Sequence, residues 1–218
     1  MIDATGLRLI LTALFVLPAL YALWLVAAPG RPLNSRVTHG FHAVMGMAMA
    51  AMSWPGGSGL LVGPQILVFS AGAVWFVIAA LTRPDGMTRP AALLRAVPHI
   101  VMMAGMVWMV AVMDGSAMAS GAGGPGHDMP GMDMSGAGAL SAMTLSGTGD
   151  RWIAGLLAFF LVGVGLRWLA QAFDQARLAT PVAAQGTAAV AGIRPGAREP
   201  ACHAAMAVGM GVMFLLLV

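Results

Sequence analysis

The stretch HAVMGMAMAAM, residues 42–52, opens with a histidine and then places methionines at steps of 3, 4 and 3 residues. The same His-x2-Met-x3-Met-x2-Met pattern returns as HIVMMAGMVWM at 99–109 and as HAAMAVGMGVM at 203–213. In an α-helix these steps keep the four side chains within an arc of about 80° and along about 15 Å of the axis. The repeat, which we call the His-Met signature, therefore predicts three helices that each carry one histidine and three methionines on one face.

The twelve side chains of the three signatures are candidate ligands for a soft metal ion. Thioether sulfur is an uncharged, soft donor that favours Cu(I) over zinc, magnesium or calcium. Methionine alone is a common core filler, so a single stripe would indicate packing. A histidine inside the membrane in all three copies favours metal binding, because ionisable residues there are rare and usually functional. The candidate Cu(I) ligands are His42, Met45, Met49, Met52, His99, Met102, Met106, Met109, His203, Met206, Met210 and Met213.

The composition indicates an integral membrane protein. Of the 218 residues, 59% are hydrophobic and only 9% are charged, and the mean hydropathy is +0.85, whereas soluble domains carry about 25% charged residues. The basic residues are all arginine and form no cluster or stripe, which excludes a nucleic-acid partner. The single cysteine excludes a disulfide within the chain. The sequence contains no phosphate-binding loop, zinc-protease motif or serine nucleophile elbow, so we do not expect an enzyme.

Six apolar segments, each near the roughly 20 residues that cross a bilayer, predict an all-α membrane protein. We expect one membrane domain over residues 1–218, in which the helices pair as three hairpins with a pseudo-threefold arrangement. The second helix of each hairpin carries the signature, and the first segment is expected to be a retained helix and not a removed signal peptide. The predicted helices cover about residues 7–28, 37–54, 60–81, 91–113, 152–173 and 201–218, with a flexible outer loop at 114–150 and a cytoplasmic linker at 174–200.

The arginines are unevenly distributed between the two ends of these helices. Nine lie on or beside the connections after the first, third and fifth segments, and two, Arg8 and Arg151, lie at the opposite end. Because positive residues collect in cytoplasmic loops, this distribution predicts a multi-pass protein of the plasma (inner) membrane with both termini outside. All three signature helices then run from the cytoplasm outward, with the histidines nearer the cytoplasm.

Further histidine, methionine and cysteine side chains lie near the two ends of the proposed path. The outer loop carries a His/Met cluster that would capture copper ions, although incidental methionines in a Gly-rich loop explain it equally well. Near the cytoplasmic end, one histidine lies one turn before His42, and the single cysteine precedes His203. A structural role is the more common one for such isolated residues. The weaker candidate ligands are His39, Met113, His127, Met129, Met132, Met134 and Cys202.

These motifs resemble those of the Ctr family of eukaryotic copper transporters. The matching pieces are Met45-x3-Met49, Met102-x3-Met106, Met206-x3-Met210, the outer cluster from His127 to Met134, and Cys202-His203. In that family, three subunits each contribute an MxxxM motif to stacked methionine triads, with Met-rich outer segments and a cytoplasmic His/Cys motif. The resemblance covers motifs only, because a single chain here holds six segments and three copies of MxxxM, and it implies copper transport into the cell. Over its whole length the chain resembles a family of uncharacterised actinobacterial integral membrane proteins.

The leading hypothesis is that the protein binds Cu(I) and conducts it inward through stacked methionine triads and a histidine triad. The expected partners are the copper ion, the lipid bilayer, and a copper chaperone or oxidase assembly factor. A haem-binding electron-transfer subunit would use the histidines as axial ligands, but it leaves nine regularly spaced methionines without a role. A non-conducting copper chaperone or storage protein would use the same ligands, and a structural subunit would use the methionines for packing alone. The sequence leaves the direction of transport and the oligomeric state open.

Overall fold

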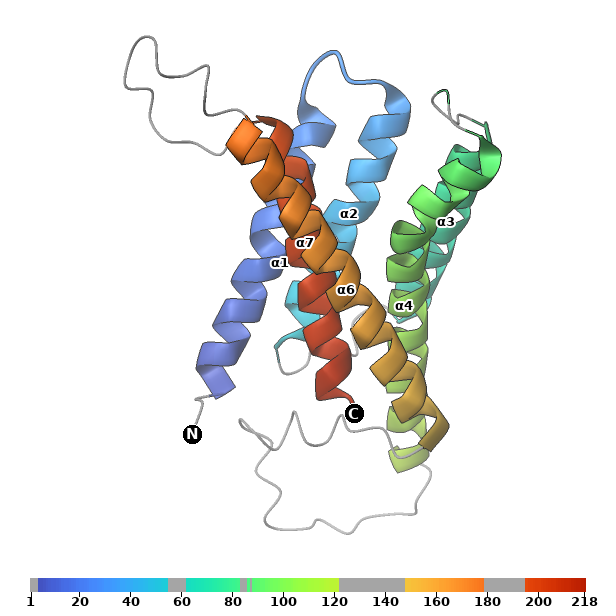
Figure 1. Ribbon diagram of the computed structural model, residues 1–218. Coiled ribbons are helices and arrows are strands. Elements are labelled where there is room, and N and C mark those ends of the chain that lie inside the picture. The colour runs from blue at the N-terminus through green and yellow to red at the C-terminus, as the bar shows by residue number, and fades with distance from the viewer. Residues whose placement is uncertain (1–3, 55–61, 83–85, 87, 122–147, 179–194) are drawn as a thin grey trace.

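The computed structural model describes residues 4–54, 62–82, 86, 88–121, 148–178 and 195–218, and every regular element within them is an α-helix. This confirms the all-α class for the part of the chain that is described. The helices are α1 (Ala4–Ala27), α2 (Leu33–Met52), α3 (Val62–Thr82), α4 (Arg89–Gly121), α6 (Thr148–Leu178) and α7 (Pro195–Leu216), as Figure 1 shows.

Five of these helices, all except α2, are long and apolar enough to cross a membrane. Helix α2 has 20 residues, which is sufficient length, but its composition is more polar because it carries Arg36, His39 and His42 along with Asn34 and Ser35. The sequence-based expectation of six apolar spans is therefore supported for five. The polar residues that lower the hydropathy of α2 include the histidine of its own signature.

The helices extend beyond the apolar segments that predicted them. Helix α4 continues through Gly121, α6 begins at Thr148 and ends at Leu178, and α7 begins at Pro195. Hydropathy marks only the part of a helix that lies in lipid, whereas backbone hydrogen bonds are local and can continue the helix into water. Parts of the expected loops at 114–150 and 174–200 are thus helical, and the remainder, 122–147 and 179–194, lies outside the described residues.

Helices that are consecutive in the chain make the most extensive contacts, with α1 packed on α2, α3 on α4 and α6 on α7. Small residues permit this close packing. A Cβ atom on Gly211 of α7 would lie 2.7 Å from Cγ2 of Val162 in α6. Further contacts join α1 to α7, α2 to α3 and α4 to α6. In Figure 1, α2, α4 and α7 run in the same direction, and α1 begins at the end of the bundle where α7 ends.

The interior and the outer surface of the bundle are both apolar, and they differ in residue type. The buried cluster combines methionines from α2, α4 and α7 with phenylalanines such as Phe15, Phe69 and Phe214. Many large apolar side chains are exposed on the outside, for example Leu67 at 73% and Phe159 at 83%. Such a surface is costly in water and favourable in lipid, so the structure is compatible with a multi-pass membrane protein.

Candidate metal centre

The three signature histidines, His42, His99 and His203, converge between α2, α4 and α7, and we call them the histidine triad. One potential ligand nitrogen from each lies within 4.8 Å of the other two. The distances between ring centroids are 5.1 Å for His42 and His99, 4.8 Å for His42 and His203, and 5.1 Å for His99 and His203. Three residues that are far apart in the sequence thus form a nearly equilateral triangle.

The spacing of the triad suits a single metal ion. Nitrogen ligands lie about 2.0–2.1 Å from a bound transition metal, so three of them arranged in a plane around one ion are about 3.5 Å apart. The upper limit of 4.8 Å in the structure exceeds this value by little more than 1 Å.

The protonation of His42 is set by the backbone. Its Nδ1 atom lies 2.8 Å from the carbonyl oxygen of Thr38, one turn earlier in α2. A carbonyl can only accept a hydrogen bond, so Nδ1 carries the proton and Nε2 keeps its lone pair. Nε2 of His42 is buried and has no hydrogen-bond partner among the described residues. This is the arrangement that orients an imidazole for metal binding through Nε2.

Two aromatic rings from the outer helices cover two sides of the triad. Phe76 of α3 lies 5.6 Å from His42 and 5.1 Å from His99, measured between ring centroids. Trp168 of α6 lies 5.2 Å from both His99 and His203. These rings, which we call the aromatic collar, close the α2–α4 and α4–α7 sides. Neither ring is predicted from the sequence, because no spacing rule connects Phe76 or Trp168 to the signatures.

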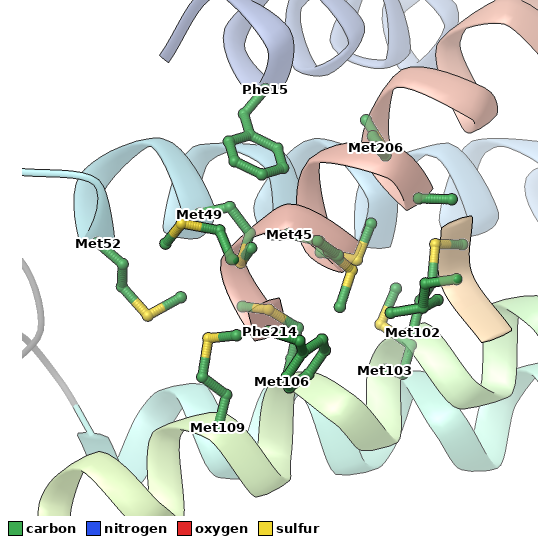
Figure 2. Close-up of a cluster of buried hydrophobic side chains, with 14 of the residues drawn as sticks. Phe15, Met45, Met49, Met52, Met102, Met103, Met106, Met109, Met206 and Phe214 are labelled. Carbon is green, nitrogen blue, oxygen red and sulfur yellow. The ribbon is translucent and has the colours of Figure 1, made fainter. Parts of the chain in front are cut away.

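The nine signature methionines lie together beyond the triad. All are buried, with exposed fractions from 0% for Met49, Met102, Met106 and Met210 to 7% for Met213, and all belong to one cluster. Figure 2 shows thioethers from α2, α4 and α7 directed into the space that these helices share. The structure therefore brings together every residue of the three predicted stripes.

Other methionines on the same helices behave differently. Met103 of α4 is also fully buried, but it is directed toward α3, where a Cβ atom on Gly72 would lie 3.1 Å from its sulfur. Met47 of α2 is 61% exposed. Burial alone thus does not distinguish the signature methionines, whereas their direction toward the shared interior does.

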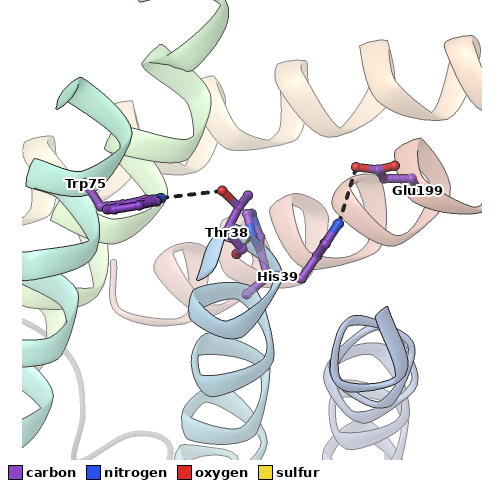
Figure 3. Close-up of polar contacts among 5 residues, drawn as sticks. Thr38, His39, Trp75 and Glu199 are labelled. Carbon is purple, nitrogen blue, oxygen red and sulfur yellow. Dashed lines mark hydrogen bonds and ion pairs between the residues drawn. The ribbon is translucent and has the colours of Figure 1, made fainter. Parts of the chain in front are cut away.

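The weaker candidate ligands that the structure describes do not join the histidine triad. His39 is buried one turn from His42, and its Nε2 atom lies 3.9 Å from Oε1 of Glu199, as Figure 3 shows. Cys202 is a half-buried free thiol that lines a groove between α1 and α7 beside Tyr21, away from the triad. The side chain of Met113 lies outside the described residues, as do His127, Met129, Met132 and Met134.

Comparisons with known proteins identify uncharacterised relatives. The chain is 34% identical over 139 residues to the uncharacterised proteins Mb0995 of Mycobacterium bovis and Rv0970 of Mycobacterium tuberculosis. The alignment covers 62% of this chain and 65% of each relative, so it spans slightly less than two thirds of their length. No solved structure matches the chain.

The family assignment covers most of the described helices. Residues 34–217 match a domain of unknown function, DUF5134, and this range includes all three signatures. The family is one of unknown function, so the resemblance to Ctr transporters rests on the motifs alone. The chain belongs to the DUF5134 family.

Proposed function

We propose that this protein binds Cu(I) at the histidine triad and conducts it across the membrane along the methionine core. The observation that carries the proposal is that the three histidines and the nine methionines lie next to each other between the same three helices. Three histidine nitrogens lie within 4.8 Å of one another, and nine buried methionines from the same three helices form one cluster beside them. These ligands are soft or intermediate and carry no charge, which favours Cu(I) over hard divalent ions.

The contacts between hairpins support a pseudo-threefold arrangement of the bundle. Helix α1 touches α7, α3 touches α2 and α6 touches α4. In each case the first helix of one hairpin meets the signature helix of another, so the three contacts close a cycle. A cyclic arrangement of this kind presents equivalent faces of α2, α4 and α7 to a common axis, where they would form layers of three ligands.

The direction of the path follows from the arginines. Seven of the nine arginines among the described residues lie toward the histidine end of the signature helices. The positive-inside rule then orients that end toward the cytoplasm of the plasma membrane, with both termini outside. Copper would enter at the methionines and leave at the histidines, where a copper chaperone or an oxidase assembly factor would receive it.

The triad geometry speaks against the haem alternative. Two axial histidines would have to leave the plane between them free for a porphyrin. Here a third imidazole lies within 4.8 Å of the other two ligand atoms, and Phe76 packs against His42 and His99. A storage or delivery protein would use the same ligands as a channel, and only a measurement of flux separates these two functions.

The test is to replace one predicted methionine layer by leucine, with Met49, Met106 and Met210 changed together. Leucine conserves volume, so the fold should persist. We expect Cu(I) affinity and flux into proteoliposomes to fall by at least about tenfold, because even loss of supporting groups around a metal costs about 10–100-fold. The measurements are bound Cu(I) per chain under reducing conditions and the initial rate of Cu(I) entry.

The matched control is the double variant Met47→Leu and Met103→Leu, which removes sulfur from α2 and α4 outside the shared interior. It should bind and conduct Cu(I) like the unaltered protein. Unchanged binding and flux in the triple variant would rule out the methionine path. If the unaltered protein binds Cu(I) but shows no flux, its function is storage or delivery and not conduction.

A further inference from the structure

The third side of the histidine triad differs from the other two. The aromatic collar of Phe76 and Trp168 covers the α2–α4 and α4–α7 sides. Among the described residues, no ring of α1 contacts a triad imidazole on the α2–α7 side. At that side, one turn toward the arginine-rich end, a histidine of α2 meets a carboxylate of α7 (Figure 3). The pseudo-threefold arrangement is thus broken where a pair of potential metal ligands lies.

The distance between the side chains of His39 and Glu199 suits a cation bound between them. Nε2 of His39 and Oε1 of Glu199 are 3.9 Å apart, which is too long for a hydrogen bond of about 2.7–3.2 Å. It is close to the sum of two metal–ligand bonds of about 2.0 Å each, one to nitrogen and one to oxygen. A cation placed between the two atoms would therefore contact both without any movement of the backbone.

The charges in the same layer differ among the three helices. The residue four positions before the signature histidine is Thr38 in α2, Arg95 in α4 and Glu199 in α7. Arg95 and Glu199 are both exposed, and Glu199 is the only glutamate in the chain. A cation that leaves the triad toward this end is repelled by Arg95 on the α4 side. On the α7 side it meets the Glu199 carboxylate, which follows Arg198 in the sequence and lies near enough to Arg31 for both to act on His39. Among the three residues of this layer, only the α7 member carries a negative charge.

The burial of the pair suits transfer between the protein interior and water. The side chain of His39 is 6% exposed and that of Glu199 is 49% exposed. The imidazole faces the interior one turn from His42, and the carboxylate reaches solvent near the start of α7. A cation bound between them would have one ligand from each environment.

We propose that His39 and Glu199 form a transfer site that takes Cu(I) from the histidine triad and releases it at the α2–α7 side of the bundle. The inference rests on the proposed function and names its exit. The site has only two protein ligands, and one of them is a hard carboxylate oxygen, so it would hold Cu(I) more weakly than the triad. Its role is therefore in the rate of release and not in the amount of copper bound tightly.

The test uses the full chain in proteoliposomes, with Cu(I) kept reduced and a colorimetric Cu(I) chelator trapped inside. Glu199→Gln keeps the size of the side chain and removes its charge. We expect the initial rate of Cu(I) transfer to fall about tenfold, since the lost attraction acts at close range, while tightly bound Cu(I) per chain stays unchanged. His39→Gln should lower the rate similarly. Asp174→Asn is the control, because it removes an exposed carboxylate of α6 at the same end and should leave the rate unaltered.

Two outcomes would overturn the transfer site. One is a rate in Glu199→Gln within about twofold of the unaltered protein, where a charge at close range should have a larger effect. The other is loss of tightly bound Cu(I) in Glu199→Gln, which would make Glu199 part of the main site. The triple leucine variant is measured alongside. If it loses flux while Glu199→Gln conducts normally, only the transfer site fails, and if the triple variant conducts normally, the proposed function fails.

Discussion

His42 shows how a single residue separates a binding role from a packing role. Its Nε2 atom is buried without a hydrogen-bond partner in the described part of the chain, although Nδ1 is held by the carbonyl oxygen of Thr38. A buried polar atom left unpaired costs about 1–3 kcal/mol. Packing alone gives no reason to keep that atom, since an apolar side chain of similar size would fill the space without the cost. A ligand at Nε2 would remove it.

The substitution His42→Leu tests this reasoning. It removes one hydrogen bond, worth about 1 kcal/mol, and also removes the unpaired nitrogen, so the free energy of unfolding should change by less than about 1.5 kcal/mol. Bound Cu(I) should fall by at least about tenfold. Thermal unfolding in detergent and Cu(I) per chain are the two measurements.

Phe69→Ala provides the packing control for this pair of measurements. Phe69 is fully buried, so its truncation should cost about 3–5 kcal/mol. If His42→Leu destabilised the protein as strongly as Phe69→Ala while Cu(I) binding persisted, the histidine would serve packing and not metal binding.

At the level of the helices, the sequence predicts the inner face best where that face differs in residue type from the rest of the helix. The signatures of α2, α4 and α7 contain histidine and methionine at helical spacing, so their inner faces could be identified. The apolar stretches of α1, α3 and α6 carry no marked polar face. Hydropathy then cannot show which face is buried, and for this reason Phe76 and Trp168 were not recognised beside the triad.

The ends of the helices also could not be predicted from the sequence. The apolar pattern stops where lipid stops, but α4 continues through Gly121 and α7 begins at Pro195. The proposed role of Glu199 depends on this extension, since the first turns of α7 place the carboxylate beside His39. The sequence marked Glu199 as the only glutamate, yet no pattern assigned it a neighbour.

Close packing between α1 and α7 gives an element-level prediction. A Cβ atom on Gly209 would lie 2.6 Å and 2.7 Å from two ring carbons of Phe15, and Phe15 is 1% exposed. Gly209→Ala should therefore lower the free energy of unfolding by about 1–3 kcal/mol, which is typical of overpacking. In α6, Gly163 has no atom within 4 Å of an added Cβ.

The control Gly163→Ala should be neutral or should stabilise the protein by up to about 1 kcal/mol, because alanine favours the helix. Thermal unfolding in one detergent compares the two variants. Equal unfolding temperatures for Gly209→Ala and Gly163→Ala would contradict the close contact between α1 and α7.

At the scale of the whole molecule, long side chains fill the centre and keep the signature helices apart. The most extensive contacts join α1 to α2, α3 to α4 and α6 to α7, and further contacts join α1 to α7, α2 to α3 and α4 to α6. The nine signature methionines occupy the space left between α2, α4 and α7. Methionine is flexible and has a polarisable sulfur, so a core of this kind can adjust its ligands to an ion with little change in the outer helices. The direction of the proposed transport depends on how the bundle is oriented in the membrane.

That orientation can be measured with single cysteines, after Cys202→Ala removes the native thiol. Leu33 begins α2 at the arginine-rich end and is 77% exposed, whereas Thr148 begins α6 at the opposite end and is also exposed (Figure 1). Seven of the nine arginines among the described residues lie toward the first end and two toward the second, so the positive-inside rule predicts that Leu33 lies in the cytoplasm. A membrane-impermeant maleimide added to intact cells should label Thr148→Cys and reach Leu33→Cys only after lysis. The reverse pattern would turn the histidine triad outward, and copper that enters at the methionines would then be leaving the cell.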